Sequence, residues 1–293
     1  MIPHAVETQG QISLPDGRRL GYGRYGDAGG APVFYFHGFP ASRLEAAMLA
    51  AAASHVGACI IAPDRPGFGR SDFQPGRRIL DWPGDVGHLA DALRLDQFAV
   101  LGASGGGPYA AACAHRLGPR LGRAASVAGL GPTTGADAER EMSATARLGF
   151  HLARRHPAIF ELAYGSLARL LARYPGLVFR LNEVTPPDRA VLARPEIRSI
   201  LTASVREALR PGVAGAVHDL RLLASPWGFC LEDIATPFHV WHGRKDGTVP
   251  YAMAESVAAR MPGARLHLLA DEGHVSLAVN HGAEIIATLL APS

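Results

Sequence analysis

The chain has 293 residues, of which 48% are hydrophobic and 19% are charged, a composition that is typical of a globular protein and excludes extensive disorder. The formal net charge is only +3, and the arginines are dispersed among acidic residues, which argues against a nucleic-acid-binding protein because no basic face or recognition motif is present. The length suits one large α/β domain that carries an insertion.

The sequence indicates neither a targeting segment nor disulfide bonds. The three cysteines, Cys59, Cys113 and Cys230, lie far apart and have no CxxC pair or histidine cluster nearby, so neither a disulfide framework nor a zinc site is expected. Residues 1–11 lack the continuous apolar stretch of a signal peptide. No run of about 18 uncharged apolar residues follows. We therefore expect a soluble cytoplasmic protein without a membrane span.

The first part of the chain alternates strand and helix patterns. Two short alternating segments at 12–14 and 20–25 flank the turn signal Pro15-Asp16-Gly17 and predict a β-hairpin. Apolar runs then predict buried strands, and Ala- and Leu-rich runs predict helices. In chain order these are a strand at 33–36, a helix at 42–55, a strand at 59–62, a helix at 79–95 that is interrupted near Pro83, a strand at 98–101, a helix at 108–117 and a strand at 124–128. This alternation indicates a mostly parallel twisted sheet with helices on both faces.

The strand pattern disappears between residues 132 and 226. This segment contains helical stretches, at 138–155 and 196–209, broken by Pro- and Gly-containing turns. Strands at 238–241 and 266–269 and helices at 252–260 and 283–290 follow it. The sequence therefore predicts an α/β core of residues 1–131 and 227–293, with a helical cap (lid) of residues 132–226 inserted after the sixth main strand.

The strongest motif is Leu101-Gly102-Ala103-Ser104-Gly105-Gly106-Gly107, which follows a predicted strand and directly precedes a predicted helix. This is the setting of a nucleophile elbow, where a serine occupies a sharp, strained turn and the glycines two positions away avoid collisions with the backbone. A Gly-rich phosphate loop is the alternative, but the segment has neither GxGxxG spacing nor the Lys-Ser/Thr pair of a P-loop. Ser104 is therefore the candidate nucleophile.

A serine nucleophile needs a histidine base and a carboxylate that orients the base. Asp246 follows the predicted strand 238–241, and His274 follows the predicted strand 266–269. Because the loops after parallel strands meet at one edge of the sheet, these two residues can converge with Ser104 despite their separation along the chain.

Other residues compete for the two supporting roles. His37, His242 and His281 are alternative bases, although a structural role is the simpler interpretation of each. Asp271 and Glu272 are alternative acids, but adjacency to the histidine along the chain does not ensure the geometry that its ring nitrogen needs.

On these residues the chain resembles the α/β-hydrolase superfamily, of the type with a helical cap. Ser104, Asp246 and His274 match the nucleophile, acid and base of that family in order and context. The resemblance spans nearly the whole chain and is weakest in the insertion. It implies the α/β-hydrolase fold.

Two further segments carry the resemblance. His37-Gly38-Phe39-Pro40 is similar to the family's oxyanion loop, which implies that the backbone N–H groups of Phe39 and Gly105 bind the oxyanion. The segment 64–71 resembles another recurrent family segment, whose role we expect to be mainly structural. Phe39 and Tyr109 each lie beside an inferred catalytic loop and are the candidate substrate-binding side chains.

The resemblance implies a carboxylesterase-like serine hydrolase that cleaves an ester, lactone or thioester through an acyl-enzyme. Its only expected partner is a small-molecule acyl substrate, and no metal or organic cofactor is needed. Haloalkane dehalogenases and epoxide hydrolases of the superfamily carry an aspartate at the elbow, which disfavours both activities here. A prolyl-aminopeptidase-like enzyme, a C–C bond hydrolase, a cofactor-free perhydrolase and a non-catalytic ligand-binding protein remain alternatives.

Overall fold

An eight-stranded sheet forms the centre of the computed structural model, which describes residues 8–134, 142–181 and 184–291. Its strand order is β1-β2-β4-β3-β5-β6-β7-β8. The strands are β1 (Thr8–Ser13), β2 (Arg19–Gly26), β3 (Ala31–Phe36), β4 (Ala58–Pro63), β5 (Phe98–Ala103), β6 (Leu121–Val127), β7 (Phe238–Gly243) and β8 (Arg265–Leu269). Strands β3 to β8 run parallel, whereas β1 and β2 form the predicted antiparallel hairpin. The predicted fold class is confirmed.

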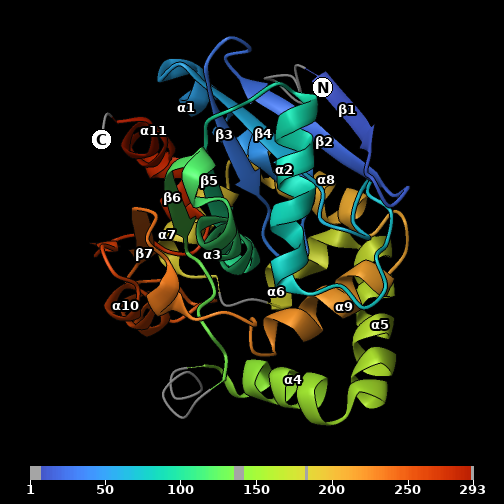
Figure 1. Ribbon diagram of the computed structural model, residues 1–293. Coiled ribbons are helices and arrows are strands. Elements are labelled where there is room, and N and C mark those ends of the chain that lie inside the picture. Colours follow the sequence, from blue (N-terminus) through green and yellow to red (C-terminus); the bar gives the residue numbers. More distant parts are fainter. Residues whose placement is uncertain (1–7, 135–141, 182–183, 292–293) are drawn as a thin grey trace.

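Helices cover both faces of this sheet (Figure 1). The helices α1 (Ala50–His55) and α11 (Ser276–Leu290) pack on one face, and α2 (Trp82–Ala92), α3 (Gly107–Arg116) and α10 (Tyr251–Arg260) pack on the other. Alternate residues of β3 enter the two separate cores, because side chains of a strand point to opposite faces. Burial on both faces explains why the central strands are continuously apolar.

The structure differs from the predicted helices in three places. The predicted helix 42–55 is a 3-10 helix, η1 (Arg43–Leu49), followed by α1. Pro83 does not interrupt a helix but lies in the first turn of α2, where its missing N–H would have had no partner. The last helix, α11, begins seven residues earlier than residue 283, at Ser276.

Between β6 and β7 the chain forms a run of helices that we call the helical insertion (residues 144–223). It comprises α4 (Ala144–Arg155), α5 (Pro157–Arg173), α6 (Val178–Leu181), α7 (Pro186–Leu192), α8 (Pro195–Ala208) and α9 (Ala214–Leu223). In Figure 1 these helices run from green through yellow to orange. Residues 138–141 of the predicted first helix lie outside the described part, and the division into core and cap at residues 131 and 227 stays a prediction. No described helix is long and apolar enough to span a bilayer.

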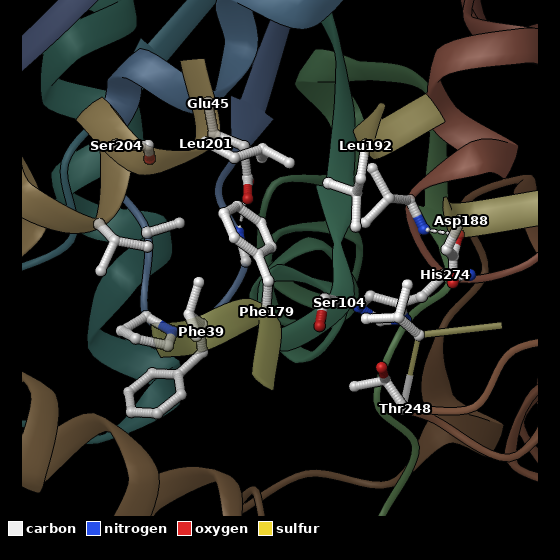
Figure 2. Close-up of a pocket in the computed structure, with 17 residues that line it drawn as sticks. Phe39, Glu45, Ser104, Phe179, Asp188, Leu192, Leu201, Ser204, Thr248 and His274 are labelled. Atoms are coloured by element: carbon white, nitrogen blue, oxygen red, sulfur yellow. Dashed lines mark hydrogen bonds between the residues drawn. The ribbon is translucent and has the colours of Figure 1, made fainter. Parts of the chain in front are cut away.

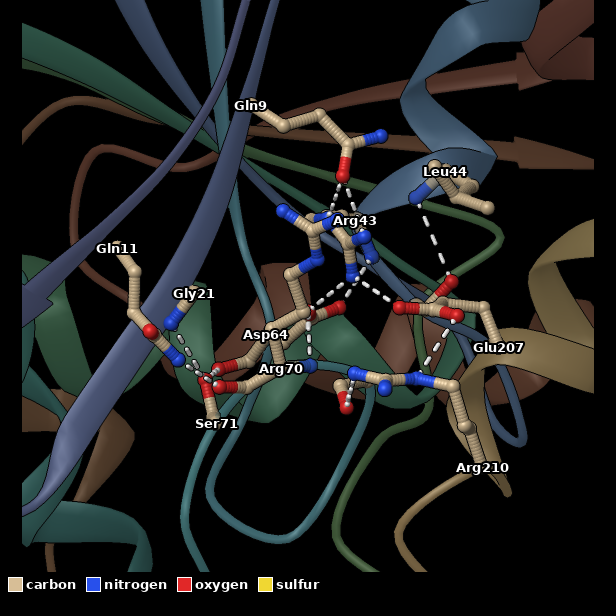
Figure 3. A network of polar contacts seen from close by, with 12 residues as sticks. Gln9, Gln11, Gly21, Arg43, Leu44, Asp64, Arg70, Ser71, Glu207 and Arg210 are labelled. Carbon is tan, nitrogen blue, oxygen red and sulfur yellow. Dashed lines mark hydrogen bonds and ion pairs between the residues drawn. The ribbon is translucent and has the colours of Figure 1, made fainter.

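A buried arginine fastens the helical insertion to the core (Figure 3). The guanidinium of Arg43, in η1, donates to Asp64 after β4 at 2.6 Å, to Glu207 on α8 at 2.8 Å, and to Gln9 on β1 at 2.6 Å. Asp64 is fully buried and also accepts the backbone N–H of Arg43 at 2.7 Å. A buried charge is stable only when it is paired and hydrogen-bonded, so this cluster fixes α8 against the sheet.

Candidate active site

Ser104 lies on the turn between β5 and α3, and its backbone φ is +49°. This is the left-handed region, which non-glycine residues enter only where the surrounding structure enforces it. A Cβ at Gly102 would overlap the carbonyl of Gly106, and a Cβ at Gly106 would overlap that of Phe36. The glycines on either side therefore allow the close backbone approach that holds Ser104 in this conformation.

His274 and Asp246 form a hydrogen-bonded pair on neighbouring loops. Nδ1 of His274 lies 2.8 Å from Oδ2 of Asp246, whose side chain is fully buried. Oδ1 of Asp246 accepts the backbone N–H groups of Thr248 and Val249, each at 2.8 Å. Because a carboxylate is acceptor-only, Nδ1 of His274 carries the proton and Nε2 is the basic nitrogen. The structure thus brings two predicted site residues into direct contact.

Burial and charge act in opposite directions on this pair. Burial opposes ionisation of Asp246, but the adjacent His274, together with hydrogen bonds from His242 and His274, holds the pKa of Asp246 well below its usual range. Burial likewise opposes protonation of His274, but the carboxylate of Asp246 outweighs it and raises the pKa of the imidazole above its ordinary value. Asp246 is therefore a fixed anion that favours the imidazolium form of its partner.

The competing side chains have other contacts. His242 is fully buried, and its Nε2 lies 2.9 Å from the carbonyl of Val249 and 3.2 Å from Oδ2 of Asp246, so it supports the acid. His281 pairs with Glu272 and Glu284. Asp271 pairs with Lys245 at the surface. None of these lines the cavity described next.

Ser104 and His274 line a cavity of about 130 Å³ (Figure 2). Its apolar lining comes from the core loop around Phe39, from the residue after His274, and from residues 178–205 of the helical insertion: Phe39, Pro40, Ala41, Val178, Phe179, Val184, Leu192, Leu201, Val205 and Val275. The polar lining side chains are those of Glu45, Ser104, Asp188, Ser204, Thr248 and His274. An apolar cavity with a few convergent polar groups is the usual form of a small-molecule site.

Phe39 and Gly105 adjoin each other beside this cavity. The position that a Cβ on Gly105 would take lies 3.6 Å from the backbone nitrogen of Phe39. Within the described residues, the N–H groups of Phe39 and Gly105 have no recorded acceptor. The structure therefore places together the two donors that the sequence suggested for an oxyanion.

The loop that contains Phe39 is held from behind by His37 and Arg65. Nε2 of His37 accepts the backbone N–H of Arg65 at 3.2 Å, so its Nδ1 is the protonated nitrogen and donates to the carbonyl of Gly38 at 2.9 Å. Burial lowers the pKa of His37 well below its ordinary value, which keeps the ring neutral. The Arg65 guanidinium donates to the carbonyls of His37 and Gly38. His37 thus shapes the loop, as expected.

Tyr109 does not line the cavity, and the expected substrate-binding role is corrected. Its side chain is fully buried, and its hydroxyl donates to Asp219 on α9. Asp219 also pairs with Arg65 at 2.9 Å and with Arg77, and these two cations hold the pKa of Asp219 well below its usual range despite burial. Tyr109 follows the elbow by only a few residues, but its position on α3 directs it into this network.

Asp188, on α7, is a residue that the sequence did not single out. Its side chain is buried, its Oδ2 accepts the backbone N–H of His274 at 2.9 Å, and its Oδ1 accepts those of Val275 and Ser276 at 2.8 and 2.9 Å. These are the donors at the start of α11, where a negative charge is favourable. A carboxylate of the helical insertion therefore holds the loop that carries His274.

Metal-binding side chains do not gather in the described part of the chain: no group of three or more His, Cys, Asp or Glu residues there could hold a metal ion. Cys59 and Cys113 are buried free thiols, and Cys230 is exposed.

Comparison with known proteins identifies the family of this fold and site. The family model described as "alpha/beta hydrolase fold" matches residues 31–280. The chain belongs to the alpha/beta hydrolase fold family. The matched region begins at β3 and extends into α11, so it includes Ser104, Asp246 and His274 as well as the helical insertion.

Three similar proteins illustrate the breadth of this alpha/beta hydrolase family. The chain is 25% identical over 281 residues to the uncharacterized hydrolase YcgS of Bacillus subtilis, covering 94% of this chain and 95% of that protein. It is 42% identical over 69 residues to a pimeloyl-[acyl-carrier protein] methyl ester esterase of Aromatoleum aromaticum, covering 23% of this chain and 27% of that protein. A bromoperoxidase structure from Bacillus anthracis aligns with a TM-score of 0.71 and 20% identity, covering 97% of this chain and 99% of that one.

The match to the esterase therefore spans only about a quarter of its length, at 27%. The likeness to the bromoperoxidase, at 20% identity, concerns the fold alone. Together with the family, these relatives support a hydrolase activity.

Proposed function

We propose that this alpha/beta hydrolase is a carboxylesterase-like serine hydrolase that cleaves an ester, lactone or thioester through an acyl-enzyme. The observation that carries the proposal is the His274–Asp246 pair at 2.8 Å, with His274 and Ser104 lining one cavity. A hydrolase needs a nucleophile, a base and oxyanion donors in one place; in this proposal Ser104 is the nucleophile, His274 is the base, and the backbone N–H groups of Phe39 and Gly105 are the donors.

The proposed reaction follows from the protonation states at the site. Nε2 of His274 takes the proton of Ser104 Oγ as the oxygen attacks the acyl carbon, and the carbonyl electron pair moves onto its oxygen. The N–H groups of Phe39 and Gly105 stabilise that oxyanion, a contribution of about 3 kcal/mol for each well-placed donor. The imidazolium then protonates the leaving group, and the carbonyl re-forms as an acyl-enzyme.

Water completes the proposed cycle. His274 takes a proton from the attacking water, the second tetrahedral intermediate collapses, and the proton returns to Ser104 Oγ as the acid product leaves. Asp246 holds the imidazole in the tautomer with a free Nε2 and stabilises its charged form. The helical insertion supplies much of the apolar lining, which supports its proposed role as a cap that selects the acyl group.

Covalent labelling with a fluorophosphonate probe tests the proposed nucleophile. The wild-type protein is expected to be labelled and to hydrolyse p-nitrophenyl acetate, whereas Ser104→Ala is expected to lose both properties. Ser166→Ala is a matched control, because Ser166 is an exposed serine on α5 whose hydroxyl donates to the carbonyl of Leu162 at 2.8 Å. Equal labelling of the folded wild type and Ser104→Ala would contradict the proposal.

A further inference from the structure

A carboxylate of the core lines the cavity together with Ser104. Glu45, on η1, lines the cavity and is only 9% exposed. The mechanism above makes no use of it. Figure 2 shows it across the cavity from His274, on the far side of Ser104.

The two oxygens of Glu45 have different surroundings. Oε2 accepts the backbone N–H of Gly38 at 2.7 Å and the hydroxyl of Tyr35 at 2.8 Å. Oε1 has no recorded hydrogen-bond partner in the described part of the chain, and it is not among the fully enclosed unpaired atoms. One oxygen therefore anchors the side chain, and the other remains available as an acceptor.

The available oxygen and the side chain of Ser104 both lie beside Gly38. The position that a Cβ on Gly38 would occupy lies 3.2 Å from Oε1 of Glu45 and 3.4 Å from Cβ of Ser104. The two side chains thus border the same small space, which exists because residue 38 is a glycine. An acyl group attached to Ser104 in this cavity shares it with the carboxylate of Glu45.

The charge of the lining favours one class of acyl group. The described lining contains two carboxylates, those of Glu45 and Asp188, and no lysine or arginine. Asp188 is already bonded to three backbone N–H groups, so Glu45 is the carboxylate that still has an unpaired oxygen. Burial raises the pKa of Glu45 above its ordinary value, because desolvation disfavours the charged form of a carboxyl group.

We propose that Oε1 of Glu45 binds a hydrogen-bond donor, an ammonium or a hydroxyl group, on the acyl part of the substrate. The inference rests on the proposed function and names the acyl class for the same site. A donor at this point satisfies the free oxygen, and an ammonium also neutralises a charge that would otherwise oppose formation of the nearby oxyanion. Buried polar groups that lose their intended partner discriminate strongly between substrates.

Three p-nitrophenyl esters of matched length test this subsite: butanoyl, 3-hydroxypropanoyl and 3-aminopropanoyl. The wild-type kcat/KM is expected to be about tenfold or more higher for at least one of the two donor-bearing esters than for the butanoyl ester. The 3-aminopropanoyl and 3-hydroxypropanoyl arms distinguish an ammonium from a neutral donor. A wild-type preference for the butanoyl ester over both others overturns the proposal.

Glu45→Gln changes the cavity-facing atom with little change in shape. The glutamine oxygen can accept the N–H of Gly38 and the hydroxyl of Tyr35, which turns its NH₂ group toward the substrate. The preference for the donor-bearing ester is expected to fall to about onefold or below, because a donor then faces a donor. The ratio of two substrates in one variant cancels any general loss of activity.

Glu207→Gln is the matched control. Glu207 lies on α8, pairs with Arg43 of η1 and does not line the cavity. Its substrate ratio is expected to equal that of the wild type. Retention of the wild-type ratio in Glu45→Gln overturns the Glu45 proposal even if hydrolysis depends on Ser104. Absence of fluorophosphonate labelling in the folded wild type would instead reject the proposed function.

Discussion

Two core loops border Ser104, and each is held by its own buried aspartate of the helical insertion. The two aspartates act through different kinds of contact. The base loop (residues 270–275) is held directly, because Asp188 accepts the backbone N–H groups of residues 274 to 276. The oxyanion loop (residues 37–40) is held indirectly, because Asp219 pairs with Arg65, which donates to the carbonyls of His37 and Gly38.

The difference determines what each aspartate should control. Asp188 contributes to raising the pKa of His274, so its charge acts on the chemistry of the base loop. Asp219 is enclosed with Arg65 and Arg77 in a fully buried network. Buried ion pairs add little net stability when complete but are costly when one partner is removed. We therefore expect rate and pH effects on the base side and stability effects on the oxyanion side.

The largest expected effect is a loss of kcat on substitution of Asp246, the hydrogen-bond partner of His274. Asp246→Asn should lower kcat by about 10⁴-fold, because an asparagine favours the wrong imidazole tautomer. Ester hydrolysis at saturating substrate measures this loss. Asp271→Asn is a control, since Asp271 is 87% exposed and pairs with Lys245 at the surface; an equal loss in both variants would contradict the assignment of Asp246.

On the oxyanion side, Asp219→Ala should lower the free energy of unfolding by about 3–5 kcal/mol, because it leaves two buried guanidinium groups without their carboxylate. Urea denaturation measures the change. The comparison variant is Asp72→Ala, which breaks the exposed Arg19–Asp72 pair and should cost about 1 kcal/mol or less. A loss for Asp219→Ala as small as that of Asp72→Ala would remove the proposed difference between the two loops.

On the base side, Asp188→Asn should change the pH dependence more than the stability. The base is active when neutral, so kcat/KM falls as the pH drops through the His274 pKa, which neighbouring carboxylates raise above its ordinary value in the wild type. Asp246, Asp188 and Glu45 all raise this pKa. Loss of the Asp188 charge should move the acidic limb to lower pH, at a stability cost of about 1 kcal/mol. An unmoved limb would reduce Asp188 to a purely structural role.

The smallest effect is expected where the helical insertion meets Arg43. Glu207→Gln should cost about 1 kcal/mol in the free energy of unfolding, because Glu207 is partly exposed and Arg43 keeps Asp64 and Gln9 as partners. Thermal denaturation measures this change. A loss comparable to that of Asp219→Ala would show that the two attachments of the insertion are equivalent.

The sequence predicted the features that local pattern controls. Apolar runs placed the strands, and the glycines around Ser104 placed the strained turn, because both depend on residues next to each other in the chain. The approach of Asp246 and His274 followed from the order of parallel strands.

Residues whose roles depend on packing between distant segments were not predictable in this way. Asp188 sits in a short helix with no motif around it, and the histidine loop that it holds is 86 residues away. Tyr109 was misjudged for the same reason, since its partner Asp219 is 110 residues away. Distance along the chain from the elbow could not show that the hydroxyl points away from the cavity.

The contacts of Asp188 and Asp219 bear on how this fold can diversify. A chimera that took its residues 132–226 from a relative would exchange the part of the pocket lining that the insertion supplies, but it would also remove both supports of the core loops. Such an exchange should preserve turnover only when the donor segment brings carboxylates equivalent to both Asp188 and Asp219. We therefore expect that a change of the helical insertion alters substrate specificity and the geometry of the two core loops together.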